Sequence, residues 1–366
     1  MVGQTIRYTA IPLALLALAC ALACARPALA AVETERVAEP ASDVRDYWTT
    51  ARLEAAVPPK LPFAASPAAA RGAPPSGPPS WVPEADAGSP ARAVLRAGEA
   101  RPDGIPGLDP SHEEIADPSA ADVSAHGKVF FTVPSGAEAG DYVCSGTAVN
   151  SRNRSVVWTA GHCVFPEGGP DFVTNWIFIP GYHEGEQPYG QWPAKRLATT
   201  GPWQEVANIK YDLGAAVVRR TGGRRLQALV GARGIAFNQP RDQTYSAYGY
   251  PAVPTFYPEF TGEREFRCVS KPMGDDEPGS SGPETMSIQC DMTGGSSGGG
   301  WIAGTTLLSV TSYGYTLELD RLYGPYLSQT AKALYASVRG KPKRKSGAKG
   351  GKGGKGGKGG GKKPRA

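Results

Sequence analysis

Short segments rich in β-branched and aromatic residues recur between residues 129 and 310 of this 366-residue chain, and Gly, Pro, Asn and Asp lie between them. This pattern predicts an all-β barrel or sandwich, because extended strands favour the first kind of residue and turns favour the second. One later segment, residues 326–338, has apolar residues at helical spacing and predicts a final helix. The expected strands are residues 129–133, 142–149, 155–159, 175–179, 213–218, 245–248, 285–289 and 306–310.

The first 30 residues have the character of an export signal. Arg7 is the only charge before an apolar run at residues 11–25, and a cleavage site follows at residues 28–30. We therefore expect residues 1–30 to be removed and the protein to be secreted, with no transmembrane segment after cleavage. A retained membrane anchor is the alternative, but a run of about 18 uncharged residues is barely long enough to span a bilayer.

Residues 31–125 are rich in Pro and Ala. From residue 57 to residue 110 there are 13 prolines in 54 residues. Proline lacks a backbone N–H and fixes φ, which opposes both sheet pairing and helix continuation. We expect a largely disordered pro-segment or spacer here, with a short helix around residues 44–57 as its one candidate for regular structure. The expected cut that removes it lies near Ser124.

The segment 339–366 is strongly basic. It holds 12 of the 39 Lys and Arg residues and no acidic residue, so the rest of the chain carries 27 basic against 34 acidic residues. Its Lys-Gly-Gly repeat predicts disorder, because glycine is costly to order and lysines repel one another. A polycation binds anionic polymers without sequence specificity. We therefore expect this tail to contact anionic cell-surface polymers, and we expect no specific nucleic-acid partner.

Three motifs carry chemistry, and they come in the order His, Asp, Ser. The motif WTAGHC at residues 158–163 places His162 at the end of an apolar strand. Asp212 stands just before another apolar strand, and the motif GGSSGG surrounds Ser297 with glycines. A serine hydroxyl is a poor nucleophile until a neighbouring base takes its proton, and a carboxylate orients that base.

Together these motifs resemble those of the trypsin-like, chymotrypsin-fold serine peptidases, in particular the bacterial branch near the glutamyl endopeptidases. The resemblance covers residues 126–338. It implies two packed six-stranded antiparallel β-barrels with a C-terminal helix, and a monomeric endopeptidase that acts on polypeptides without a cofactor or metal. By the same resemblance Ser297 is the nucleophile, His162 the base and Asp212 the residue that orients the base. The N–H groups of Gly295 and Ser297 then form the oxyanion hole.

Ser296 competes with Ser297 for the role of nucleophile. Only Ser297 is followed directly by two glycines, as the motif of the family requires. Animal members carry an acid at the position of Ser296, which receives a freed amino terminus on activation. That ion pair is unavailable here, so activation by removal of a pro-segment needs another mechanism.

Four cysteines lie outside the export signal. An even number in an exported chain predicts disulfides, and four cysteines allow three pairings. The resemblance pairs Cys144 with Cys163, beside the catalytic histidine, which leaves Cys268 to pair with Cys290. No spacing among them is typical of a zinc site.

The residues that determine specificity are less well indicated. Asp291 lies six residues before Ser297, where trypsin has the acid that selects Arg or Lys. Ser312, Tyr313 and Gly314 resemble the strand of the family that pairs with the substrate chain. That strand contains no histidine, which argues against cleavage after glutamate.

Two other functions compete with a peptidase. The first is a catalytically silent peptidase-like module that binds anionic surfaces through the basic tail, although such modules usually lose a catalytic residue. The second is an esterase on another fold, because Gly295-Ser296-Ser297-Gly298-Gly299 also fits the nucleophile-elbow motif. That fold places its histidine after the serine, and no histidine follows Ser297.

Overall fold

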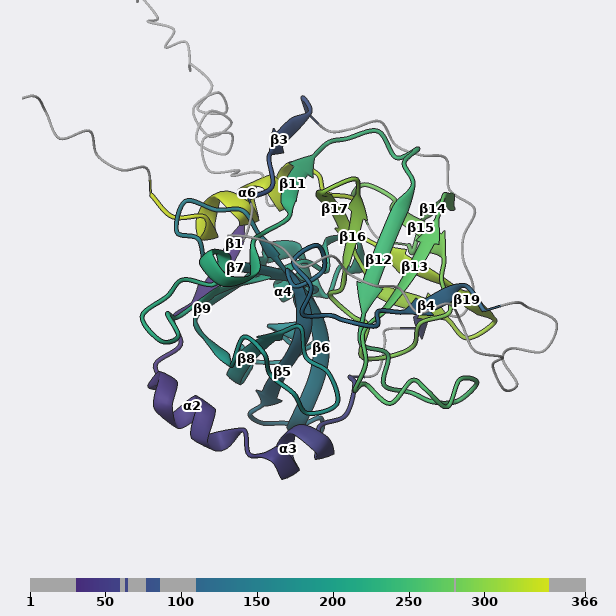
Figure 1. Cartoon of the computed structure of the whole chain (residues 1–366). Helices are drawn as coiled ribbons and strands as arrows, with labels where there is room; N and C mark the ends of the chain where they lie inside the picture. Colours follow the sequence, from purple (N-terminus) through teal and green to yellow (C-terminus); the bar gives the residue numbers. More distant parts are fainter. Residues whose placement is uncertain (1–30, 60–62, 65–76, 86–109, 280, 342–366) are drawn as a thin grey trace, which may run out of the picture.

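A computed structural model describes residues 31–59, 63–64, 77–85, 110–279 and 281–341. Its two halves are both mainly β and lie side by side, the first half in teal and the second in green to yellow (Figure 1). The expected export signal at residues 1–30 lies outside the described residues, as does nearly all of the expected basic tail. In the part of the chain described, no helix has the length and apolar character needed to cross a membrane.

The first half is a closed barrel of six antiparallel strands. The ring runs β9-β10-β7-β6-β5-β8 and closes where β8 pairs with β9, at Ile177–Pro193 and Phe178–Trp192. Its interior is filled by aromatic and aliphatic side chains such as Trp176, Phe178 and Trp192, all buried. The strands are β5 (His126–Val133), β6 (Gly140–Val149), β7 (Val156–Thr159), β8 (Thr174–Pro180), β9 (Trp192–Thr200) and β10 (Gly214–Val218).

The second half consists of two sheets, where a second closed six-stranded barrel was expected. One sheet has the order β3-β11-β17-β16-β12-β13-β4 and the other β14-β15-β19-β18-β2. The Cys268–Cys290 disulfide joins them, because Cys268 lies on β13 and Cys290 directly follows β15. The strands are β3 (Ser80–Val82), β4 (His112–Glu114), β11 (Gly234–Phe237), β12 (Tyr245–Gly249), β13 (Phe266–Ser270), β14 (Pro272–Asp276), β15 (Thr285–Gln289), β16 (Gly300–Ala303), β17 (Thr306–Val310), β18 (Tyr313–Tyr315), β19 (Glu318–Gly324) and β2 (Phe63–Ala64).

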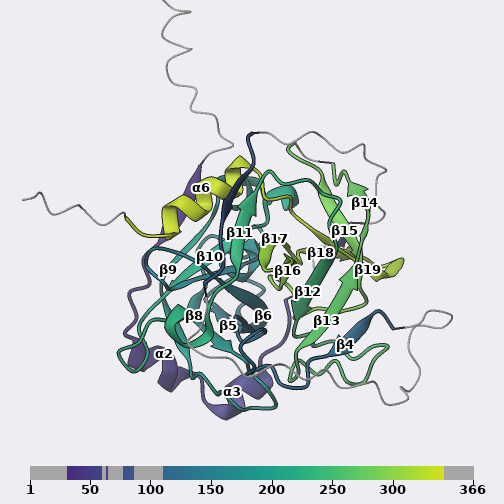
Figure 2. The ribbon, with the colours of Figure 1, turned by 45° about the horizontal axis from the view of Figure 1, so that its top comes forward.

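Each of the eight expected strands coincides with an observed strand to within a residue or two at most ends, except that β5 begins three residues earlier. The final helix, α6 (Gln329–Val338), is also present, and it packs across the first barrel (Figure 2). It starts three residues later than expected because the backbone of Ser328, the residue directly before it, is extended. Strand β9 was missed, since Pro193, Lys195 and Arg196 interrupt its apolar pattern.

The segment 31–125 differs most from expectation. In its described parts, β1 (Val32–Glu35) pairs with β9, and β3 and β4 add to the second half. Two short helices, α2 (Ala41–Tyr47) and α3 (Thr50–Ala55), cover one end of the first barrel (Figure 1). None of the residues that pair in β1, β3 and β4 is a proline, so each keeps a backbone N–H. These short stretches can therefore join sheets although the segment as a whole is rich in proline.

Candidate active site

His162 lies in a short 3-10 helix, η2 (Gly161–Cys163), which follows β7 directly. Its neighbour Cys163 forms a disulfide with Cys144 of β6, as the resemblance implied. The Asp212 carboxylate accepts two hydrogen bonds from His162, one from its backbone N–H and one from ring Nδ1, both at 2.8 Å. Backbone and ring are therefore both held, with only 6% of the residue exposed.

Asp212 caps the 3-10 helix η3 (Ile209–Tyr211), two residues before β10. Barrel pairing brings it to His162, because Gly214 at the start of β10 is paired with Thr159 at the end of β7. The carboxylate is completely buried and also accepts a hydrogen bond of 2.6 Å from the Ser312 hydroxyl. An acceptor at Nδ1 favours the tautomer that carries its proton there, which leaves Nε2 as a proton acceptor.

Ser297 comes from the other half of the molecule, in the loop before β16. The backbone oxygen of this residue accepts a 2.7 Å hydrogen bond from the Ser145 N–H on β6 and lies 3.8 Å from the sulfur of Cys163. A ring nitrogen of His162 lies within 4.8 Å of the sulfur atoms of Cys144 and Cys163. Residues from the two halves thus meet around the Cys144–Cys163 bridge.

The Ser297 hydroxyl and His162 Nε2 are both buried, and neither has a hydrogen-bond partner among the described residues. Buried polar groups are nearly always paired, so an orphan calls for an explanation. Ser296 is different: its hydroxyl donates to the Thr293 carbonyl at 2.6 Å. Of the two adjacent serines, only Ser297 has a hydroxyl left free.

The glycines of the GGSSGG motif allow this loop to pass close to the backbone of neighbouring segments. Gly295 has φ of +98°, and a Cβ there would lie 2.4 Å from the Tyr250 carbonyl oxygen. In the described structure no hydrogen bond engages the N–H groups of Gly295 or Ser297. Two backbone donors therefore remain available beside the Ser297 hydroxyl.

Replacing Gly298 with alanine is expected to lower the free energy of unfolding by about 3 kcal/mol. Gly298 has φ of +79°, and its Cβ would lie 2.0 Å from Thr159 Oγ1 and 2.5 Å from the Ser145 carbonyl oxygen. Gly136→Ala is the matched control, since Gly136 has φ of +91° with nothing within 4 Å of its Cβ. That control should cost only about 1 kcal/mol. Urea denaturation measures both, and equal losses would contradict the steric argument.

Ser312 directly precedes β18, and Tyr313 and Gly314 are its first two residues. The Ser312 hydroxyl contacts Asp212. Tyr313 is completely buried, and its hydroxyl donates to Asp276 at 2.6 Å. Burial, followed by the Asp276 carboxylate, raises the pKa of Tyr313, so this hydroxyl stays protonated and keeps donating.

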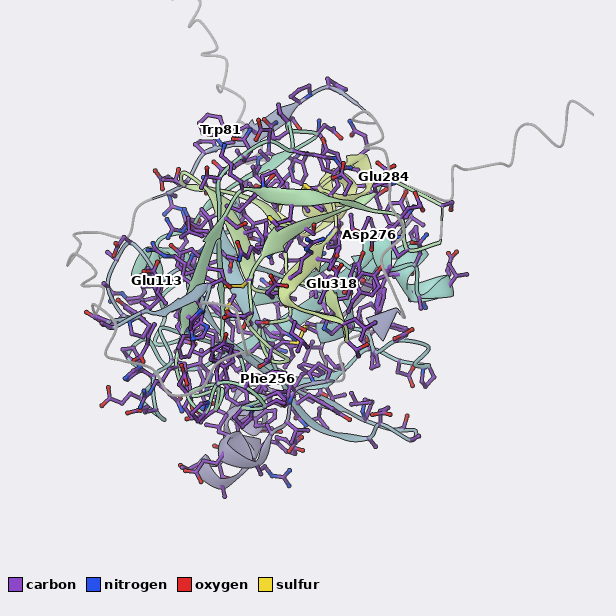
Figure 3. The ribbon with its side chains drawn as sticks, turned by 90° about the vertical axis from the view of Figure 1, so that its right-hand side faces the viewer. Trp81, Glu113, Phe256, Asp276, Glu284 and Glu318 are labelled. Carbon is purple, nitrogen blue, oxygen red and sulfur yellow. A yellow bond between two sulfur atoms is a disulfide. The ribbon has the colours of Figure 1, made fainter. Side chains whose placement is uncertain are left out.

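Asp276, labelled in Figure 3, is a functional candidate that the sequence did not indicate. It is completely buried and also accepts a hydrogen bond from the Tyr315 hydroxyl at 2.5 Å. It therefore holds both tyrosines of β18. No motif surrounds it, and only the pairing of β14 with β15 brings it behind β18.

Asp291 is engaged by the segment before the first barrel. Its carboxylate contacts His112 Nδ1 at 2.8 Å and accepts a hydrogen bond from the Ser111 N–H at 3.0 Å. Burial by itself would raise the pKa of Asp291, but His112 and the Ser111 N–H together bring it below its ordinary value. A cationic substrate side chain would have to displace His112 to reach this carboxylate. His112 escaped notice in the sequence because the expected domain began at residue 126.

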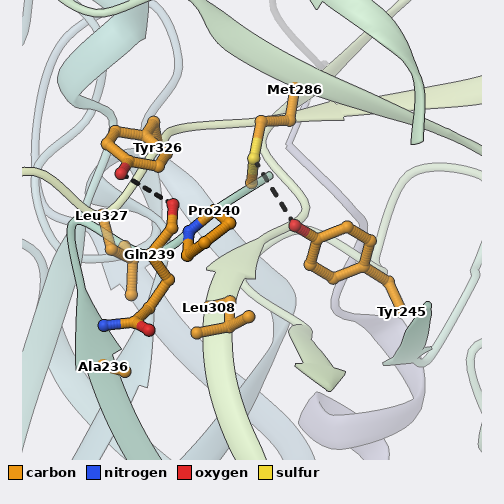
Figure 4. A pocket seen from close by; sticks show the side chains of 8 residues that line it. All are labelled: Ala236, Gln239, Pro240, Tyr245, Met286, Leu308, Tyr326 and Leu327. Atoms are coloured by element: carbon orange, nitrogen blue, oxygen red, sulfur yellow. Dashed lines mark hydrogen bonds between the residues drawn. The ribbon is translucent and has the colours of Figure 1, made fainter. Parts of the chain in front are cut away.

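A cleft of about 270 Å³ adjoins His162. Phe131, Tyr142 and Glu167 line it, as does Pro59 of the N-terminal segment. A second cavity, of about 10 Å³, lies in the second half between Tyr245, Tyr326 and their neighbours, and none of the three candidate catalytic residues lines it (Figure 4).

Cys144, His162 and Cys163 are close enough together to suggest a metal site. Both sulfurs are bonded to each other, however, so neither is a thiolate that could ligate a metal. This group of residues is thus suited to holding the histidine rather than a metal ion.

Comparison with solved structures finds similar proteases from bacterial and extremophilic sources. The chain is 35% identical to the protease Anisep from Arthrobacter nicotinovorans, covering 62% of this chain and 99% of that one, with a TM-score of 0.54. It is 40% identical to AL20, a thermostable serine protease from an extremophilic microorganism, covering 60% of this chain and 98% of that one, also with a TM-score of 0.54. Comparison with family models and with curated proteins gives no match.

Proposed function

Since this chain belongs to the chymotrypsin-fold serine proteases, we propose that it is a secreted endopeptidase that hydrolyses peptide bonds through an acyl-enzyme at Ser297. The observation that carries the proposal is the pair of unpartnered buried atoms, Ser297 Oγ and His162 Nε2, next to the His162–Asp212 pair. The two disulfides agree with an extracellular location. In this proposal the two sheets of the second half correspond to the second barrel of the family.

The proposed reaction follows from the available donors and acceptors. His162 Nε2 takes the proton of the Ser297 hydroxyl as its oxygen bonds to the carbonyl carbon of the substrate. The N–H groups of Gly295 and Ser297 stabilise the oxyanion of the tetrahedral intermediate. His162 then gives its proton to the leaving amine as the C–N bond breaks, and water later releases the acyl group by the same steps. Asp212 stabilises the imidazolium in both stages.

Labelling with a fluorophosphonate tests this proposal on protein recovered from culture medium. A single covalent adduct on Ser297, found by mass spectrometry together with loss of peptide hydrolysis, is the expected result. The same spectrum gives the mature amino terminus, which tests removal of residues 1–30. A protein that neither labels nor hydrolyses peptides would leave the silent binding module as the better hypothesis.

Specificity for Arg or Lys through Asp291 is a separate proposal, and it requires that His112 give way to the substrate. A library of peptides that differ at the residue before the cut decides it. Preferential cleavage after Arg and Lys would support a role for Asp291, and equal cleavage after Arg and Leu would remove it.

A further inference from the structure

Part of the N-terminal segment lies along the candidate active site. We call residues 57–59 and 63–64 together the cleft segment. Val57 pairs with β6, donating its N–H to the Asp141 carbonyl at 3.2 Å and accepting from the Val143 N–H at 2.9 Å. Its other end, β2 (Phe63–Ala64), pairs with β18.

The two prolines that follow Val57 stand beside catalytic groups. Pro59 lines the cleft to which His162 contributes. Pro58 stands against Gly294, where an added Cβ would lie 3.3 Å from the proline Cβ. Gly294 directly precedes Gly295, one of the two proposed oxyanion donors. The cleft segment therefore lies at two places along the candidate site. Residues 57–59 lie beside His162 and Gly294, and residues 63–64 lie beside β18.

The proposed chemistry determines the direction in which a substrate must run. His162 protonates the leaving amine, so the part of a substrate that follows the scissile bond lies on the His162 side, in the cleft. The part that precedes the bond lies on the other side, along β18. The Ser312 hydroxyl donates a hydrogen bond to Asp212 at the catalytic centre, and Ser312 directly precedes β18. The strand therefore runs away from the centre toward Tyr315. A substrate that approaches the centre along β18 is therefore antiparallel to it.

The cleft segment runs the opposite way. Phe63 is paired with Gly314 and Ala64 with Tyr315, in parallel register, so the chain leaves the centre as it moves along β18. Its earlier residues, 57–59, lie on the leaving-group side. We propose that the cleft segment is an intramolecular inhibitor that binds the substrate site in reverse. This inference depends on the proposed peptidase function.

Reversal explains how the segment occupies a protease without being cut. A peptide bond presented to Ser297 in this direction has its nitrogen toward β18 and its carbonyl-side residues toward the cleft. The amine that must leave is then remote from His162 Nε2, which is the only proposed source of its proton. Without that proton the C–N bond does not break, and any tetrahedral adduct returns to the intact segment.

The residues before the cleft segment anchor it to the first barrel. Trp48 and Leu53 are buried against barrel residues, and the Trp48 ring N–H donates to the Asn175 carbonyl at 2.5 Å. Arg52 of α3 pairs with Asp141, the same residue whose carbonyl receives the Val57 N–H. The inhibitor is thus held in place by contacts that a free peptide substrate does not have.

Val57→Pro in the full chain tests the proposal. Proline removes the N–H that binds Asp141, while Ala56 already has the extended conformation that a residue before proline favours. We expect kcat/KM for a peptide substrate to rise by roughly tenfold. Val57→Ala is the matched control: it keeps the N–H and trims a side chain that is 54% exposed, so its rate should equal that of the unchanged protein. Thermal unfolding verifies that all three proteins are folded.

A synthetic peptide with the sequence of residues 50–64 provides a second measurement on the Val57→Pro protein. It should inhibit competitively and remain intact by mass spectrometry, whereas a peptide with the same residues in reversed order should not inhibit in this way. Cleavage of the native-order peptide within residues 57–64 would overturn the reversed orientation. Equal rates for the unchanged and Val57→Pro proteins, with both labelled at Ser297 by a fluorophosphonate, would overturn the inhibitor and leave the peptidase standing. Absence of both labelling and hydrolysis in every variant would overturn the peptidase function and the inhibitor with it.

Discussion

Replacing Ser297 with alanine is expected to lower kcat for peptide hydrolysis by roughly 10⁶-fold. The proposed mechanism has no other oxygen to form the acyl-enzyme, so only the oxyanion donors and substrate binding still assist the reaction. The hydroxyl makes no hydrogen bond among the described residues, so its removal should not lower the free energy of unfolding. Stopped assays at saturating peptide, with thermal unfolding in parallel, measure the two effects.

Ser296→Ala is the control for that experiment. Its hydroxyl donates to the Thr293 carbonyl, so the substitution should cost about 1 kcal/mol of stability and leave the acyl-enzyme chemistry intact. The opposite result, an active Ser297→Ala protein and an inactive Ser296→Ala protein, would transfer the role of nucleophile to Ser296.

Asp212→Asn is expected to lower kcat by roughly 10⁴-fold. The Asp212 carboxylate accepts hydrogen bonds from the His162 N–H, His162 Nδ1 and the Ser312 hydroxyl. Asparagine has the same shape but carries one NH₂ group, which cannot accept from Nδ1. The imidazole then adopts the tautomer with its proton on Nε2, where it cannot take the proton of Ser297. The imidazolium also loses the negative charge that stabilises it.

Glu265→Gln is the matched control for Asp212→Asn. Glu265 is another fully buried carboxyl, and burial raises its pKa well above the ordinary value, which favours the uncharged acid that glutamine resembles. We expect kcat to remain unchanged in this variant. The dependence of rate on peptide concentration gives kcat for both variants. If Asp212→Asn lowers kcat no more than Glu265→Gln does, Asp212 does not act on His162.

The elements that the sequence predicted correctly are those with a local signal. Runs of β-branched and aromatic residues indicated strands such as β6 and β15, because such side chains suit a half-buried or buried pleated surface. The pairing of Cys144 with Cys163 came from the resemblance of their flanking motifs, and the structure has it. Strand β9 was missed because barrel closure, rather than its own apolar pattern, keeps it extended.

The candidate site divides in the same way. His162, Asp212 and Ser297 stand in short motifs, so the sequence alone indicates their residue types and their order along the chain. Asp276 and His112 stand in no motif: each matters only because a strand pairing places it against Tyr313 or Asp291. Contacts between residues more than 30 positions apart leave no periodic trace in the chain, and one sequence by itself does not reveal them.

The region before the first barrel shows the limit most clearly. Its composition alone indicated a spacer, and the prolines at 58 and 59 indeed offer no N–H for pairing. Composition determines which backbone groups are available, and local motifs determine which side chains have the chemistry of a triad. Only the tertiary structure decided that Val57 binds β6 and that β2 pairs with β18 in parallel register. The physical reason is that the direction of a strand beside its partner depends on where the chain enters and leaves, and backbone hydrogen bonds form in either orientation.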